Sequence, residues 1–252
     1  LIADSYDSPY FEIRRDIHPI IWNSEYWHDY DVYYMKGKRL GRCRNFIYGI
    51  NEKLRFSRFW LFVRINDTIW LNCLRKKTPL VKLENQDIFV DIPEGLRYLG
   101  LKLKFSLKYL ANKDYDVIIK TTSSSIFNKN ILDSFLTSYY EKDSFFYGGS
   151  IINKGDYQFA SGANLILSRK SIDLIVNKNF YWDQSVLDDV AIGKIMKKAG
   201  VTITEFETLN IESLEYLKNL EKTIDYFYKT FKDKKVGLIL KISKANNCIR
   251  DK

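Results

Sequence analysis

Two adjacent carboxylates, Asp188 and Asp189, have a residue type and a position that suit acid–base chemistry. They stand near the start of residues 185–199, which have the periodicity of a helix. Ser185 and Asp188 have the spacing of a capping box, in which a hydroxyl and a carboxylate satisfy free amides at a helix start. Asp189 is then left in the first turn, where the helix dipole favours a charged carboxylate that can act as a general base. From spacing alone, the alternative that both acids only begin the helix is the stronger one.

A run of five hydroxyl residues, 121–125, follows an apolar strand expected over residues 115–120. Ligands of open α/β sheets bind beyond the carboxyl ends of the strands, and hydroxyls there can donate to phosphate or sugar oxygens. The run offers no carboxylate for a hard cation. A polar turn capping the next helix, with Asn128 as N-cap, is the alternative interpretation.

Two further segments could contact a ligand. Ser161 and Gly162 lie in a stretch of small residues that lets a backbone come close to a ligand, although a tight turn into a strand explains the stretch equally well. Trp182 and Asp183 come shortly before the two acids, and an indole ring can stack on a sugar. Most rings in a chain with 15% aromatic residues are nevertheless expected in the core.

The elements that position these residues indicate an α/β fold, because short apolar runs alternate with helix-period segments over 252 residues. A helix is expected from Pro93, because the leucines at 96, 99, 103, 107 and 110 share one face. A hairpin is expected around residues 66 and 67. The other expected elements are strands at 1–3, 31–35, 87–90, 115–120, 145–149, 164–167 and 202–206, and helices at 10–22, 129–140, 185–199 and 214–232.

Composition and motifs exclude several classes of protein. Cys43, Cys73 and Cys248 are widely spaced and form no C-x-x-C pair, which argues against a disulfide framework or a structural zinc site. The chain has no G-x-G-x-x-G, Walker A, G-x-S-x-G or H-E-x-x-H motif. No signal peptide or spanning segment is visible, which favours a soluble, cytoplasmic chain.

Positive charge is concentrated at the C-terminal end. The net charge is +9, and residues 218–252 hold ten basic and four acidic residues. Such a segment fits an anionic membrane surface, nucleic acid or an acidic substrate, but a solvated helical face explains it more simply. No recognisable motif of interleaved aromatic and basic residues supports nucleic-acid binding, so we expect no nucleic-acid partner. The oligomeric state is left open.

The order of these segments resembles that of the fringe and β-1,3-glycosyltransferase group, glycosyltransferase family 31, over about residues 1–206 with an insertion near 41–84. Glu94 to Lys102 reads EGLRYLGLK, where the family has E-x-x-x-N-L-x-L-K. Residues 115–127 read YDVIIKTTSSSIF, where relatives read YDFVLRTDDDVF. Gly148-Gly149 and the text FASGANLILS then match a G-G strand, a short hairpin and an SG turn. Residues 188–193, DDVAIG, match the family's acidic helix start.

The resemblance implies a GT-A type single domain, with a central mixed, mainly parallel sheet flanked by helices. This domain is expected to cover residues 1–213, and a basic helical segment, 214–252, is expected to pack on it. The implied activity is inverting transfer of a sugar from a nucleotide-diphosphate donor, with a UDP-sugar favoured, to a hydroxyl of a glycan or glycosylated acceptor. Asp189 is implied as the general base, with Asp188 beside it, and the alternative is an inactive homologue that only binds nucleotide sugar or carbohydrate. The implied donor-binding residues are Ala3, Asp4, Ser5, Arg14, Arg15, Lys102, Thr121, Thr122, Ser123 and Ser124, and the acceptor-binding residues are Ser161, Gly162, Trp182 and Asp183.

One departure concerns the divalent cation, Mn²⁺ or Mg²⁺, that relatives hold with a D-x-D motif to neutralise the leaving diphosphate. This chain has Thr122-Ser123-Ser124 at that place. Hydroxyls with Lys102, Arg14 or Arg15 replace the metal in the favoured interpretation. Weak metal binding through other groups and loss of activity are the alternatives, and no metal ligand is assigned.

Overall fold

A computed structural model describes residues 1–3, 27–38, 79–94, 98–122, 125–127, 129–154, 157–177, 182–183, 186–206, 208–211 and 237–240. Within these residues the chain has mixed α/β structure, with eight strands in the main sheet. These strands are β1 (Ile2–Ala3), β2 (Tyr34–Lys38), β3 (Val81–Glu84), β4 (Asp87–Pro93), β5 (Val117–Thr122), β7 (Tyr147–Gly149), β10 (Asn164–Ser168) and β11 (Thr204–Glu205). Their order across the sheet is β11-β7-β10-β5-β1-β2-β4-β3.

The centre of the sheet is parallel, because β5, β1, β2 and β4 run in the same direction. β10 enters antiparallel between β5 and β7, and β3 pairs antiparallel with β4 at the edge. From β1 the chain moves outward to β2 and β4, and then returns to β5 on the other side of β1. Such a reversal is a topological switch point, and ligands of open sheets bind at the carboxyl ends of the strands there. We call this side of the sheet the carboxyl edge.

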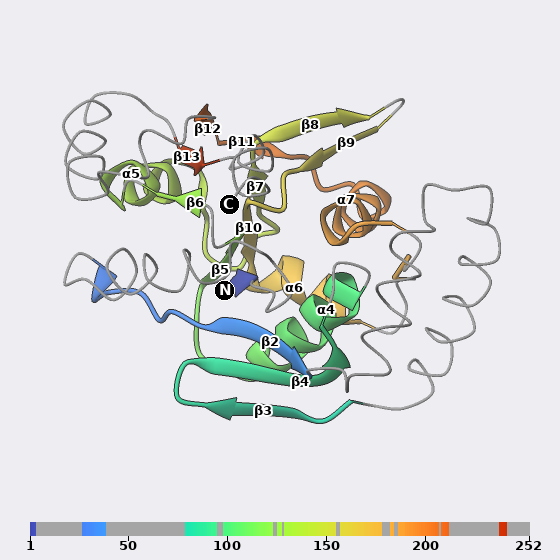
Figure 1. The fold of residues 1–252 in the computed structure, drawn as a ribbon. Coiled ribbons are helices and arrows are strands. Elements are labelled where there is room, and N and C mark those ends of the chain that lie inside the picture. The colour runs from blue at the N-terminus through green and yellow to red at the C-terminus, as the bar shows by residue number, and fades with distance from the viewer. Residues whose placement is uncertain are drawn as a thin grey trace, which may run out of the picture.

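Helices cover both faces of the sheet (Figure 1). Three of them, α4, α6 and α7, pack together over one face, and α5 lies on the other. The period of two along β5 divides the cores, because Ile118 joins the core under α4, α6 and α7 while Ile119 packs against the core under α5. The helices are α4 (Leu99–Leu110), α5 (Lys129–Tyr139), α6 (Arg169–Val176) and α7 (Asp188–Lys198).

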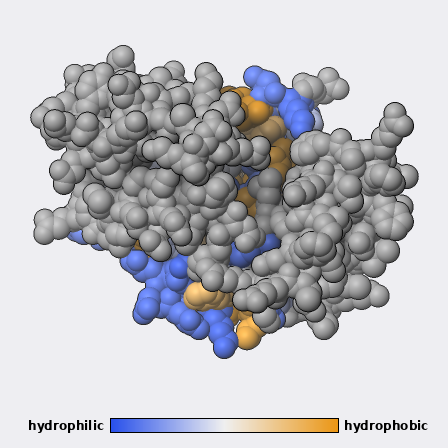
Figure 2. Space-filling view, viewed as in Figure 1, coloured by the Kyte–Doolittle hydropathy of each residue, from blue (hydrophilic) through white to orange (hydrophobic). Residues whose placement is uncertain are grey.

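Two smaller sheets complete the described structure. β8 (Ile151–Lys154) and β9 (Tyr157–Ala160) form a hairpin. β13 (Gly237–Leu240) lies between β12 (Thr208–Ile211) and β6 (Ser125–Ile126), so a C-terminal strand pairs with the end of the hydroxyl run. Hydrophilic side chains gather on the β8–β9 hairpin and near the β3–β4 edge (Figure 2).

The structure confirms most of the expected elements, with shifted ends. The leucine face of α4 is confirmed, because Leu103, Leu107 and Leu110 are buried. Its expected start at Pro93 is wrong, since β4 continues to that residue and α4 begins at Leu99. The second strand lies three residues later than expected at its start, and β5 includes Thr121 and Thr122, which were expected in the loop.

Several elements were not expected or lie elsewhere. α6, β3 and β12 had no counterpart among the predictions from the sequence, and β13 is a strand within the tail expected to be helical. Part of the expected insertion, Val81–Glu84, belongs to the main sheet as β3. The helices expected at 10–22 and 214–232 and the hairpin around residues 66 and 67 lie outside the described residues. None of the described helices has the length and hydropathy needed to cross a bilayer.

Candidate functional site

A buried polar cluster lies at the carboxyl edge and joins three elements. The Nζ of Lys120, at the end of β5, donates to the carbonyl of Gly162 at 2.6 Å and forms an ion pair with Oδ2 of Asp188 at 2.9 Å. Lys120 is 1% exposed and Asp188 is 5% exposed. Beside them, the amide of Gly162 donates to Oδ2 of Asp189 at 3.1 Å. The cluster therefore connects the central strand, the turn before β10 and the start of α7.

Local structure explains why these four residues meet. Lys120 follows Ile118 by two positions, so its side chain leaves the sheet on the α4, α6 and α7 face. α7 begins at Asp188 on that face. The turn between β9 and β10 carries Gly162, and Asn164 beyond it is paired with Thr121 of β5.

Asp189 is held by backbone amides and is half-buried. Its Oδ1 accepts from the amide of Val190 at 2.8 Å, in addition to the bond from Gly162. Burial raises the pKa of the Asp189 carboxyl, and the charge of Asp188 raises it further, whereas the Gly162 amide, the Lys120 ammonium and the Val190 amide oppose the rise. A carboxylate has about four lone-pair sites, so two hydrogen bonds leave it able to accept a proton. A base with a raised pKa binds that proton more strongly than an ordinary aspartate.

The expected capping box is wrong. α7 begins three residues later than predicted, with Leu187 as N-cap and no side-chain capping bond. Asp188 pairs with Lys120 instead. Its Oδ2 accepts no hydrogen bond from the described residues, so the contact with Lys120 is an ion pair rather than an aligned hydrogen bond.

Two glycines allow the close approaches that build the cluster. A Cβ on Gly162 would lie 2.8 Å from Lys120 Nζ and 3.3 Å from Asp189 Oδ2. A Cβ on Gly193, one turn into α7, would lie 2.5 Å from Cβ of Phe159 in β9. The glycine of the DDVAIG segment therefore lets α7 pack directly on the hairpin strand that leads to Gly162.

The turn between β9 and β10 is itself anchored. Thr121 Oγ1 donates to the carbonyl of Ala163 at 2.8 Å. Ser161 donates its amide to Ser150 at 2.8 Å, and Asn164 Nδ2 donates to Ser150 Oγ at 2.6 Å. Thr121 and Ser161, which were assigned to the donor and acceptor sides from the sequence, thus hold the turn next to Asp189.

Lys102 has a different environment from the one expected. It is 1% exposed, and its Nζ lies 2.6 Å from Oε2 of Glu94, which follows β4 at the carboxyl edge. The other oxygen of Glu94 accepts the amide of Gly37 in β2. The ammonium of Lys102 is thus paired with a buried carboxylate.

Trp182 and Asp183 are also engaged within the protein. Trp182 is 2% exposed, and its ring packs against Gly100 of α4, so it belongs to the core rather than to an acceptor-facing surface. Asp183 accepts from Lys194 of α7 at 2.7 Å. Trp182 therefore attaches this segment to α4, and Asp183 attaches it to α7.

Within the part of the chain that the structure describes, no set of side chains suits the divalent cation that the family resemblance implies. Thr122 ends β5 beside Ala3 of β1, and its hydroxyl bonds with that of Ser125 at 3.0 Å. Hard cations prefer carboxylates, and no group of three His, Cys, Asp or Glu side chains converges within the described ranges. The remaining expected donor residues, Asp4, Ser5, Arg14, Arg15, Ser123 and Ser124, lie outside the described residues.

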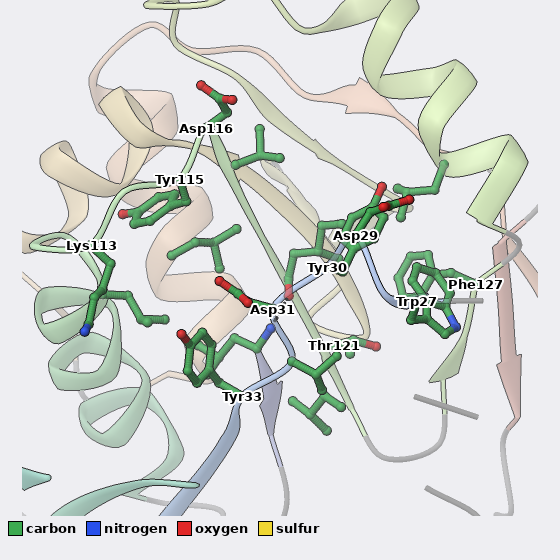
Figure 3. A pocket seen from close by; sticks show the side chains of 18 of the residues that line it. Trp27, Asp29, Tyr30, Asp31, Tyr33, Lys113, Tyr115, Asp116, Thr121 and Phe127 are labelled. Atoms are coloured by element: carbon green, nitrogen blue, oxygen red, sulfur yellow. Dashed lines mark hydrogen bonds between the residues drawn. The ribbon is translucent and has the colours of Figure 1, made fainter. Parts of the chain in front are cut away.

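A cavity of about 410 Å³ lies elsewhere, toward the amino-terminal end of β5 (Figure 3). Aromatic and acidic side chains line it, including Trp27, Asp31, Tyr33 and Asp116. Neither Asp188 nor Asp189 lines this cavity. We place the candidate site at the carboxyl edge instead, because buried charges and a half-buried carboxylate converge there.

Lys120 is the member of the cluster that the sequence predictions missed. The signal was present, because a lysine inside the apolar text YDVIIK is unusual for a strand buried on both faces. A buried lysine needs a partner, and the two acids were the candidates.

Neither protein-family models nor curated proteins identify a relative of this chain. The class that the structure defines is therefore a mixed α/β protein with a polar cluster at the carboxyl edge of its sheet.

Proposed function

We propose that this chain is an inverting glycosyltransferase of the GT-A kind, with Asp189 as the general base. The observation that carries the proposal is the state of Asp189. Its carboxylate is half-buried, is oriented by two amides and has a raised pKa, and it lies where ligands of such sheets bind. The mixed sheet with parallel central strands and helices on both faces agrees with the fold that the family resemblance implies.

In the proposed reaction, a hydroxyl oxygen of the acceptor attacks the anomeric carbon of the sugar. The bond between that carbon and the diphosphate oxygen breaks, and the nucleoside diphosphate leaves with the electron pair. Asp189 takes the hydroxyl proton as the new glycosidic bond forms. The configuration inverts because attack and departure occur on opposite faces of the sugar.

The donor is a nucleotide-diphosphate sugar, and a UDP-sugar is the expected one. In this proposal it lies across the ends of β1 and β5, at Ala3 and Thr122, where the switch point of the sheet falls. Hydroxyls of the 121–125 run and the cations Arg14 and Arg15 are proposed to bind the diphosphate. Lys102 is left out of that role because Glu94 already neutralises it.

The test compares the wild type with Asp189→Asn in transfer from, and slow hydrolysis of, a panel of UDP-, GDP-, TDP- and CMP-linked sugars, with and without Mn²⁺. We expect the variant to keep its fold and to lose at least about 100-fold in kcat, as for removal of a general base. Asp173→Asn is the matched control, because that carboxylate is exposed on α6. Unchanged turnover in Asp189→Asn contradicts the proposal, and stabilisation of the wild type by a nucleotide sugar without transfer or hydrolysis supports an inactive binding homologue instead.

A further inference from the structure

We infer that Lys120 is the positioning residue for Asp189: its ammonium holds the Gly162 carbonyl and the Asp188 carboxylate together, and so fixes the Gly162 amide against Asp189. The part of this inference that concerns catalysis rests on the proposed function. The positioning itself rests on the geometry alone.

The first step is that one ammonium links all three elements of the site. Lys120 Nζ lies 2.6 Å from the Gly162 carbonyl oxygen and 2.9 Å from Asp188 Oδ2. Gly162 thus accepts a hydrogen bond from Lys120 through its carbonyl and donates one to Asp189 through its amide, at 3.1 Å. Moving the ammonium therefore displaces the glycine that orients Asp189.

The second step is that folding alone gives no reason for this charge. A buried ion pair is weak evidence for stability, because desolvation offsets much of the attraction, and apolar residues of similar volume are often as stable. Ile118 shows that the same face of β5 accepts an apolar side chain. A lysine at position 120 instead supplies a charge and a donor beside the half-buried carboxylate.

The third step is electrostatic. Among the described residues, the charged and titratable groups that face Asp189 are Lys120 from β5, Asp188 from α7 itself and the Tyr147 hydroxyl from β7, and the turn before β10 presents the Gly162 backbone. Lys120 lowers the pKa of Asp189 and Asp188 raises it. The two partners of the ion pair, Lys120 and Asp188, thus shift the pKa of Asp189 in opposite directions.

Because these two shifts in pKa are opposite, the titration of Asp189 can distinguish a positioning role of Lys120 from a merely structural one. Lys120→Met removes the positive charge and loosens the Gly162 amide, and both changes raise the pKa of Asp189. Asp188→Asn removes a negative charge and lowers it. A variant that only lost stability would show neither the raised pKa expected for Lys120→Met nor the lowered pKa expected for Asp188→Asn.

The experiment follows the Asp189 carboxyl carbon by NMR as a function of pH, assigned by its absence in Asp189→Asn, and needs no donor or acceptor. We expect the midpoint to rise in Lys120→Met and to fall in Asp188→Asn. Lys102→Met is the matched control, because it also removes a buried, ion-paired lysine near the carboxyl edge, and it should leave the midpoint unchanged. A midpoint that stays at the wild-type value in Lys120→Met overturns the inference.

A second variant covers the case in which Lys120→Met does not fold. The double variant Lys120→Met/Asp188→Asn leaves no unpaired charge, and we expect faster hydrogen exchange at the Gly162 amide, with kcat lower by about 10-fold and KM little changed. Unchanged exchange and kcat overturn the inference. If the wild type shows no transfer at all while the NMR midpoints move as expected, the proposed function fails and the positioning role stands.

Discussion

Asp188 and Asp189 show how neighbouring residues of one type take on different roles. Successive side chains on a helix point about 100° apart, so the two carboxylates of the first turn of α7 face different surroundings. Asp188 turns inward to Lys120, and Asp189 reaches the amide of Gly162. The environment of each carboxylate, and not its type, separates the ion-paired acid from the proposed base.

The raised pKa of Asp189 has a consequence for stability. The folded chain holds this proton more tightly than the unfolded chain, so ionisation of Asp189 destabilises the fold. The stability that the protonated form contributes is fully present below the unfolded value of 3.8, and it is lost as the pH rises through the folded pKa. Asparagine does not titrate and avoids that loss.

We therefore expect Asp189→Asn to increase the free energy of unfolding at pH about 8 by about 1 kcal/mol, which is a typical gain for a single stabilising substitution. The gain should be smaller at pH about 4 than at pH about 8, because the raised pKa means that the folded wild type carries more of this proton at the lower pH. Urea unfolding at both pH values measures it, with Asp173→Asn as the control. A loss of stability at the higher pH would show that the ionised carboxylate is better solvated than its burial indicates.

The main elements were predictable from local patterns, but their ends were set by contacts between elements. The apolar run 115–120 predicts β5 because it is continuous, yet Thr121 and Thr122 extend the strand by pairing with β1 and β10. The capping-box spacing at Ser185 is real in the sequence, but α7 starts where Asp188 can meet Lys120. Partners distant in the chain decide such boundaries, and local propensity carries no information about them.

The packing of α7 on β9 depends on Gly193. A Cβ there would lie 2.5 Å from the Cβ of Phe159, which is closer than two carbon atoms can approach. We expect Gly193→Ala to lower the free energy of unfolding by about 1–3 kcal/mol, despite the better helix propensity of alanine, because overpacking forces the hairpin strand away. Thermal or urea unfolding measures the change.

Lys198→Ala is the control for that substitution, since it changes an exposed position of the same helix and should stay within about 0.5 kcal/mol of the wild type. Because β9 leads directly to Gly162, Gly193→Ala should also lower the proposed transferase activity. A stabilised Gly193→Ala variant would mean that α7 and β9 are not in direct contact.

At the scale of the whole molecule, the carboxyl edge gathers residues from distant parts of the chain. Glu94 with Lys102, Thr122 beside Ala3, and Lys120 with the acids of α7 lie along it. The order of motifs predicted the sheet and the acidic helix start. It could not predict that lysines 102 and 120 are both buried in ion pairs, because pairing depends on which strand ends become neighbours.

The same edge receives a strand from the C-terminal region. Ile239 of β13 pairs with Ser125, the last residue of the hydroxyl run, and Leu238 pairs with Ile126, so β13 covers the backbone of β6. Backbone groups of a short strand exchange with solvent when their partner is lost. The C-terminal strand thus restrains one end of the proposed diphosphate-binding segment.

We expect deletion of residues 237–252 to speed amide hydrogen exchange at Ser125 and Ile126 by at least about 10-fold, because β6 loses its ladder. Exchange at β5 should stay slow, since β1 and β10 still flank that strand. Deletion of residues 243–252 alone is the matched control, because it leaves β13 in place. If β13 restrains the hydroxyl run as proposed, the longer deletion also weakens stabilisation by a nucleotide diphosphate, whereas equal exchange in the two deletions would show that β6 does not depend on β13.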